Sequence, residues 1–225
     1  MISQKQKTPS SYSFFIIIFT ALLVQLVGSY YAKYFIIGGS FYLLWVLLRI
    51  LVPVLVIMLM RMPFPRMGLG VPRIDRNMGR ILIIGVVILI AVFAGIYFLQ
   101  GYFAFYSNSF NGQGGLARFA GFMIFTGSTL TGWEFLHRSF LLMGLVYVLT
   151  EREKVPAETA AKIAVAVVWI FEVVFHFIKP ELEALGMLAG SPILSWLALR
   201  TRSIWPPFLI HVLVELLFIA ALIMR

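Results

Sequence analysis

Three pairs of ionisable side chains, each separated by four residues, lie inside otherwise apolar stretches of the sequence. The pairs are Glu134 with Arg138, Glu172 with His176, and His211 with Glu215. Because residues four apart share a face of a helix, the two members of each pair can contact each other. A charged group at the centre of a membrane helix costs about 2.5–3.5 kcal/mol, so such groups usually have a partner and a function. These residues are therefore the candidate site.

Hydrolysis is one reaction that this set of side chains supports. A glutamate removed from bulk water, such as Glu134, can act as a general base near neutral pH. Histidines 176 and 211 can hold the attacking water, protonate the leaving amine or donate to the oxyanion. Arg138 would keep a nearby glutamate ionised and oriented. We therefore name Glu134, Arg138, His176 and His211 as the candidate catalytic residues, which helix packing must bring together.

Metal binding is a second possibility for part of the same set. Glu172, His176, His211 and Glu215 offer two imidazoles and two carboxylates, which are suitable ligands for Zn²⁺. The chain contains no cysteine and no His-Glu-x-x-His helix, so we expect no cofactor and keep zinc as the alternative. A third possibility is that each pair is only an intrahelical contact that supports packing.

The composition predicts an all-α polytopic membrane protein. The 225 residues are 61% hydrophobic and 12% charged, and their mean hydropathy is +0.98. A water-soluble domain would need more polar surface. The net charge of +9 fits basic loops that face anionic lipid better than nucleic acid binding. The expected partner is therefore the lipid bilayer.

Seven apolar segments are long enough to be predicted as transmembrane helices, which would form a bundle around a buried polar site. They are residues 13–28, 35–60, 81–102, 118–150, 160–178, 181–199 and 208–224. We treat residues 1–225 as a single membrane domain, in which residues 1–117 carry the N-terminal helices and residues 118–225 the core with the site. Basic residues collect in alternate loops, which predicts a multi-pass protein of the cell (inner) membrane with a cytoplasmic N-terminus.

Two apolar segments contain features that a simple membrane span does not explain. Residues 118–150 are longer than a bilayer needs, so we expect a break near residues 127–132. Thr131 would then be the N-cap of the second half, and Glu134 would have the spacing of a capping box. Arg49 and Pro53 interrupt the second segment. For Arg49 we expect either snorkelling or pairing with a neighbouring helix.

Residues 131–215 resemble the CAAX-protease and bacteriocin-processing (CPBP, or Abi) family of intramembrane endopeptidases. The signatures of that family are, in order, Glu-Glu-x-x-x-Arg, Phe-x-x-x-His and His-x-x-x-Asn. They match here at Glu134 with Arg138, at His176 and at His211. The resemblance implies a glutamate-type, metal-independent protease that hydrolyses a peptide bond. Its substrate would be a peptide or a membrane-anchored protein.

Three positions depart from these signatures. Trp133 replaces the first Glu, Glu172 stands where the family has Phe, and Glu215 replaces Asn. In the family the first Glu is credited with activating water, so the resemblance implies that Glu134 or Glu172 takes over that step. His137, Glu172 and Glu215 are the expected supporting residues. The alternative is a catalytically silent relative that acts as a membrane immunity, binding or scaffold protein.

Overall fold

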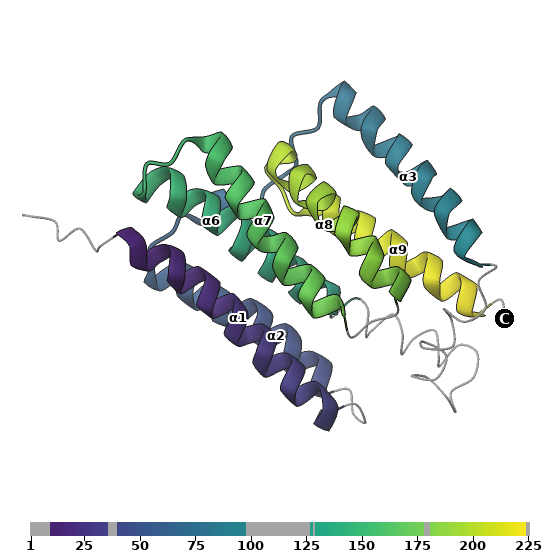
Figure 1. Cartoon of the computed structure of the whole chain (residues 1–225), viewed down its shortest axis with the longest axis horizontal. Helices are drawn as coiled ribbons and strands as arrows, with labels where there is room; N and C mark the ends of the chain where they lie inside the picture. Colours follow the sequence, from purple (N-terminus) through teal and green to yellow (C-terminus); the bar gives the residue numbers. More distant parts are fainter. Residues whose placement is uncertain (1–9, 36–39, 98–126, 128, 178–180, 224–225) are drawn as a thin grey trace, which may run out of the picture.

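The computed structural model describes residues 10–35, 40–97, 127, 129–177 and 181–223, and this part of the chain is all-α (Figure 1). The N-terminal elements are α1 (Ser10–Phe35), α2 (Ser40–Leu59), the short 3-10 helix η1 (Phe64–Met67) and α3 (Arg76–Tyr97). Residues 129–134 are helical and continue as η2 (Phe135–Met143), α6 (Gly144–Tyr147) and η3 (Val148–Arg152). We call residues 129–152 the motif helix. The chain then forms α7 (Ala157–His176), α8 (Glu181–Thr201) and α9 (Trp205–Ile223).

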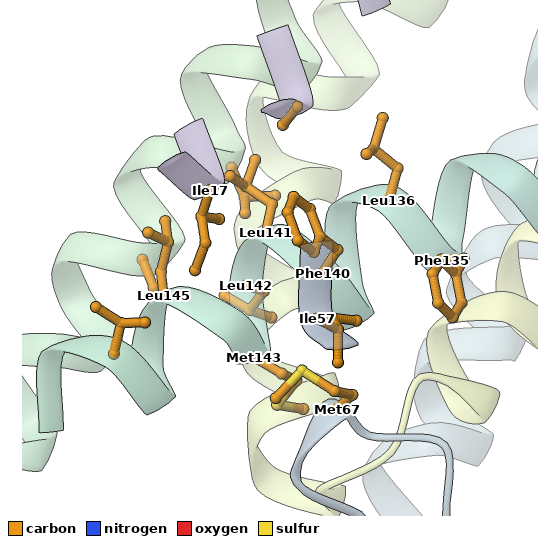
Figure 2. Close-up of a cluster of buried hydrophobic side chains, with 14 of the residues drawn as sticks. Ile17, Ile57, Met67, Phe135, Leu136, Phe140, Leu141, Leu142, Met143 and Leu145 are labelled. Atoms are coloured by element: carbon orange, nitrogen blue, oxygen red, sulfur yellow. The ribbon is translucent and has the colours of Figure 1, made fainter. Parts of the chain in front are cut away.

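The motif helix lies at the centre of the packing, against α1, α2, α7 and α8. All side chains of residues 134–145 are buried. Leu136 and Phe140 are fully inaccessible and belong to one hydrophobic cluster with Ile17 of α1 and Ile57 of α2 (Figure 2). Because apolar neighbours surround this helix, its few polar side chains must find partners on other helices.

The motif helix is widened over two stretches that have π-helical hydrogen bonding. The first, η2, begins directly after Glu134 and carries His137 and Arg138. The second is η3. π-Helical turns are rare and occur frequently at functional sites.

One of two local predictions for this helix is wrong. A break was expected near residues 127–132. Residues 129–134 are helical without a break, and residues 98–126 and 128 lie outside the described residues, so a break there stays a prediction. Thr131 is not an N-cap, because its hydroxyl donates to the Gly127 carbonyl at 2.6 Å. A threonine inside a helix commonly satisfies its hydroxyl in this way. Glu134 therefore has no capping role, and its carboxylate contacts Arg138 of the same helix and His211 of α9.

Gly132 lets α2 approach the motif helix closely. A Cβ atom added at Gly132 would lie 3.1 Å from Cβ and 3.2 Å from Cδ of Arg49. The α2 helix continues through Arg49 and Pro53 instead of breaking there. Arg49 is buried, with 3% of its surface exposed, and it pairs with α1. We expected Arg49 either to snorkel or to pair with a neighbouring helix. The structure shows the pairing and excludes snorkelling.

Basic turns meet at one end of the bundle. Arg61, Lys154 and Arg202 end α2, η3 and α8, and their φ angles are 53°, 60° and 54°. A positive φ suits the residue that ends a helix, and a cationic side chain there complements the helix dipole. The Arg152 guanidinium donates to the Met60 carbonyl, which joins the ends of η3 and α2. The Arg73 N–H also donates to the Thr201 carbonyl, which joins the loop after α2 to the end of α8. These three basic turns therefore lie near one another, and their side of a membrane stays a prediction.

Large apolar side chains remain exposed on the outer faces of the helices. Phe19 of α1 is 64% exposed and Leu209 of α9 is 63% exposed. Two helical stretches, Tyr12–Tyr30 and Ala157–His176, are long and apolar enough to cross a membrane, as judged by length and composition in the described residues. The all-α class is thus confirmed, and seven membrane spans stay a prediction.

Candidate functional site

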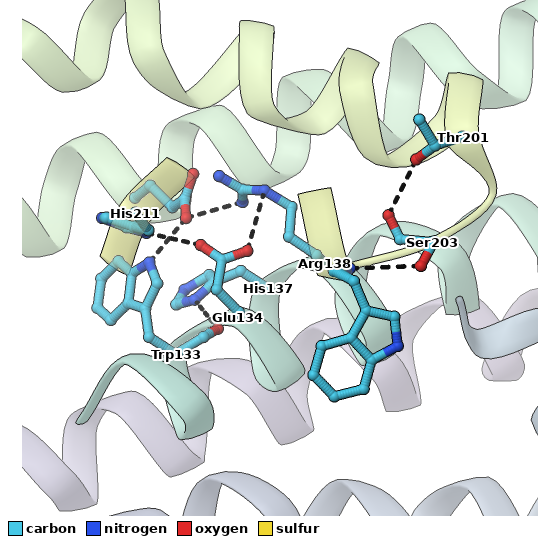
Figure 3. A network of polar contacts seen from close by, with 9 residues as sticks. Trp133, Glu134, His137, Arg138, Thr201, Ser203 and His211 are labelled. Atoms are coloured by element: carbon cyan, nitrogen blue, oxygen red, sulfur yellow. Dashed lines mark hydrogen bonds and ion pairs between the residues drawn. The ribbon is translucent and has the colours of Figure 1, made fainter. Parts of the chain in front are cut away.

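A buried polar cluster joins the motif helix to α7 and α9 (Figure 3). The Nδ1–H of His211 donates to Oε1 of Glu134 at 2.7 Å. Nη1 of Arg138 lies 2.8 Å from Oε1 of Glu172, and its Nε lies 3.8 Å from Oε2 of Glu134. The side chains of Glu134, Arg138 and Glu172 are at most 1% exposed, whereas that of His211 is 12% exposed. Only the histidine of this cluster thus reaches the surface.

Arg138 is the cation that both carboxylates of this cluster share. Glu134 comes from its own helix and Glu172 from α7, so the guanidinium holds the two helices in register. A buried carboxylate without a cation or hydrogen-bond donors is strongly unfavourable. The cluster therefore depends on Arg138 more than on any other of its side chains.

The Trp133 side chain contacts residues of the motif helix, α2 and α7. Its Nε1–H donates to Oε1 of Glu172 at 2.9 Å. Its ring lies 4.1 Å from the ring of His137 and 5.0 Å, edge to face, from the ring of His176, measured between centroids. The guanidinium carbon of Arg49 is 5.0 Å from the Trp133 ring centroid, in cation–π geometry.

A second chain of polar contacts runs from the motif helix toward α1 and α2. Arg49 donates from Nε and Nη2 to Oε1 of Gln25, at 3.2 and 2.8 Å. Nε2 of Gln25 lies 3.1 Å from Nε2 of His137, and Nδ1 of His137 lies 2.9 Å from the Trp133 carbonyl oxygen. Because a carbonyl only accepts, Nδ1 of His137 must carry the proton, and Nε2 must accept from the Gln25 amide.

The predicted pairs exchange partners in the structure. Glu134 and Arg138 do form an ion pair, but the shorter contact of Arg138 is to Glu172. His176 donates from Nδ1 to the backbone carbonyl of Glu172 at 2.7 Å, not to its carboxylate. His211 contacts Glu134 across helices. Its expected partner, Glu215, is half-buried one turn further along α9 and acts on His211 through its charge.

The structure brings the four candidate catalytic residues to one region. Glu134 contacts both Arg138 and His211. His176 lies against the Trp133 ring, and the Nε1–H of that ring donates to Glu172, the partner of Arg138. His137, expected as a supporting residue, faces Gln25 instead of the carboxylates. Sequence reasoning missed Gln25, although an amide in the middle of an apolar helix is itself an unusual feature.

The alternative zinc site does not form among the described residues, where no three His, Asp or Glu side chains are grouped so that they could hold a metal ion. Nδ1 of His211 and Nδ1 of His176 both point at oxygen acceptors of the protein. The Glu172 carboxylate faces the Arg138 guanidinium, which would repel a metal cation. The described side chains of this set therefore do not form the arrangement that zinc would need.

Comparison of the chain with protein-family models, with curated proteins and with solved structures finds no match.

Proposed function

We propose that the protein is a membrane-embedded peptidase in which Glu134 and His211 activate the water that hydrolyses a peptide bond. The observation that carries this proposal is the 2.7 Å contact between Nδ1 of His211 and Oε1 of Glu134. A carboxylate that accepts from Nδ1 fixes the tautomer and leaves Nε2 as the basic nitrogen. His211 is also the member of the cluster with exposed surface, so it is the one that water and substrate can meet.

The proposed roles differ from those expected from the sequence. Glu134 is buried and occupied by His211, so it orients and charges the histidine instead of meeting water itself. His211 would take a proton from water through Nε2 and return it to the leaving amine. Arg138 pairs with Glu134 and helps to orient it. His176, on the other side of Trp133, stays the predicted donor to the oxyanion.

The membrane location belongs to the same proposal. Large apolar side chains are exposed on α1, α2, α3, α7 and α9, as expected of helices that face lipid. The basic turns gather at one end, as the positive-inside rule requires of a cytoplasmic face. A multi-pass protein with a cytoplasmic N-terminus accounts for both features. The substrate would then be a membrane-associated peptide or protein.

The chain offers a test that needs no known substrate. Wild-type protein and the His211→Asn and Glu134→Gln variants would be produced in cells, and new peptide N-termini in the membrane fraction identified by mass spectrometry. We expect N-termini that appear with wild type and disappear with both variants. Glu158→Gln is the matched control, because Glu158 is an exposed carboxylate paired with Lys162. Identical N-termini in all four samples would contradict peptidase activity.

A catalytically silent binding protein is the second candidate, and Trp133 is the observation that favours it. An indole cannot activate water, and its ring contacts both His137 and His176. On this alternative the polar cluster only holds α7 and α9 together. Biological function would then survive His211→Asn as long as the protein folds.

A further inference from the structure

Five buried side chains at the junction of the motif helix, α7 and α8 carry polar atoms without a hydrogen-bond partner among the described residues. These atoms are Oε2 of Glu134, Nε and Nη2 of Arg138, Oε2 of Glu172, and the hydroxyl oxygens of Ser191 and Ser195. All five residues are 0% exposed. Buried polar atoms are almost always paired with protein or with ordered water. Six such atoms on five neighbouring side chains therefore indicate a common partner.

The two serines place α8 at this junction. Ser191 and Ser195 are one helical turn apart and share a face of α8, which packs along α7 and contacts the motif helix. The Ser191 hydroxyl faces the Glu172 carboxyl group, although no hydrogen bond of ordinary geometry joins them. Pro192, between the serines, has no N–H, so the Leu188 carbonyl lacks its usual helical donor.

We infer that ordered water binds at this junction, held by Arg138, Glu172 and Ser191, with Ser195 one turn further. The set combines donors on the guanidinium, acceptors on the carboxylates, and hydroxyls that do both. Water satisfies all of these and needs two to four polar partners. A cation would be repelled by Arg138, and an anion by Glu134 and Glu172. Arg138 and Glu172 were candidate residues in the sequence analysis, whereas Ser191 and Ser195 were not.

The use of this water rests on the proposed function. Hydrolysis consumes one water molecule for each peptide bond, and the apolar interior of a membrane supplies none. Water held beside Glu134 and Arg138 would lie next to the Glu134–His211 pair. Ser191 and Ser195 would then be positioning residues that keep a water molecule inside the bundle.

Thermal unfolding tests the water site, because hydroxyls bonded to water and hydroxyls without a partner predict different changes in Tm when they are removed. The Ser191→Ala, Ser195→Ala double variant would be compared with Ser139→Ala, whose hydroxyl donates to the Met67 carbonyl at 2.7 Å. If water bonds the two hydroxyls, the double variant should lower the Tm at least as much as the control, by about 2–4 °C or more. If the two hydroxyls have no hydrogen-bond partner, the double variant should have an unchanged or higher Tm, and that result would overturn the inference.

A high-resolution density map gives the direct measurement. We expect a solvent peak within hydrogen-bonding distance of the Ser191 hydroxyl and of Arg138 or Glu172, lost in the double variant. A dry junction would overturn the water site even in a protein that cleaves peptides. An occupied junction in a protein that never cleaves would uphold the site and remove the peptidase proposal.

Discussion

The motif helix presents two polar faces that are built in different ways. Toward α7 and α9, Glu134 and Arg138 contact charged or ionisable groups, and one of these, His211, reaches the surface. Toward α1 and α2, His137 accepts from Gln25, which in turn accepts from Arg49, and none of the three is more than 3% exposed. The first face has a carboxylate–imidazole contact and an accessible edge. The second has a fixed direction of donation and no accessible group.

This difference separates chemistry from support. A carboxylate–imidazole pair can gain or lose a proton during a reaction, whereas an amide that bridges a guanidinium and an imidazole has only one arrangement that satisfies all its partners. The α1–α2 face therefore fixes the position of the motif helix. The α7–α9 face carries the residues proposed to react, and their arrangement depends on that position. Substitutions on the two faces should then separate loss of stability from loss of activity.

The largest effect should come from removing the shared cation. Arg138→Leu leaves Glu134 and Glu172 buried without it, and breaking a buried charge pair in this way costs about 3–5 kcal/mol. Because total stability is about 5–15 kcal/mol, we expect little folded protein. Yield and size-exclusion profile in detergent would measure it. Arg200→Leu, on the exposed end of α8, is the control, and equal yields of the two variants would contradict the account.

Gln25→Leu should break the supporting face with a smaller cost. It leaves Nε2 of His137 without its amide donor and Arg49 without the oxygen it binds, for about 1–3 kcal/mol. The Tm should fall, while the rate of cleavage for each folded molecule stays that of wild type. Thermal unfolding and a cleavage assay on the folded fraction would measure both. A folded variant that has lost cleavage would show that this face takes part in the chemistry.

Gly132→Ala tests how closely α2 must approach the motif helix. The added Cβ would lie 3.1 Å from Cβ of Arg49, and overpacking of this kind costs about 1–3 kcal/mol. Gly85→Ala is the matched control, because a Cβ there meets nothing within 4 Å in the described structure. Replacing an exposed helical glycine by alanine stabilises by about 0.5–1 kcal/mol. The two variants should therefore shift the Tm in opposite directions, and a shift in the same direction would contradict the close packing.

The smallest effect should come from the surface pair of Arg66 and Glu151. Arg66 lowers the pKa of the Glu151 carboxyl group from 4.5, chiefly by hydrogen bonding and then by its charge. The pair therefore stabilises the fold above about pH 4.5, and this contribution is lost as the pH falls through the lowered pKa. Both side chains are about half exposed, so the effect is small. Glu151→Gln should change the Tm slightly at pH 7 and not at all at low pH, and a larger change at low pH would be contrary to this.

The helices and most of the site could be predicted from the sequence, because length and hydropathy define apolar helices and charges inside them are rare. Each predicted apolar segment overlaps a helix, and Glu134, Arg138 and His211 do meet. The partners within the cluster could not be predicted. Spacing of four residues suggested Glu172 with His176, but the Glu172 carboxylate contacts Arg138 and Trp133 of the motif helix. Tertiary packing decides which helix faces contact each other. The pairing of Gln25 with His137 depends on such a contact, so the sequence alone does not predict it.

The central claim is that Glu134 holds His211 in one tautomer while Gln25 holds His137 in a separate network. The chain has three histidines, so ¹⁵N NMR of histidine-labelled protein can resolve each ring. We predict protonated Nδ1 atoms on both His211 and His137, with an Nδ1 signal of His211 typical of a hydrogen bond to a carboxylate. Glu134→Gln should shift the His211 signals and leave those of His137 unchanged. His211 signals that do not respond to Glu134→Gln would contradict the account.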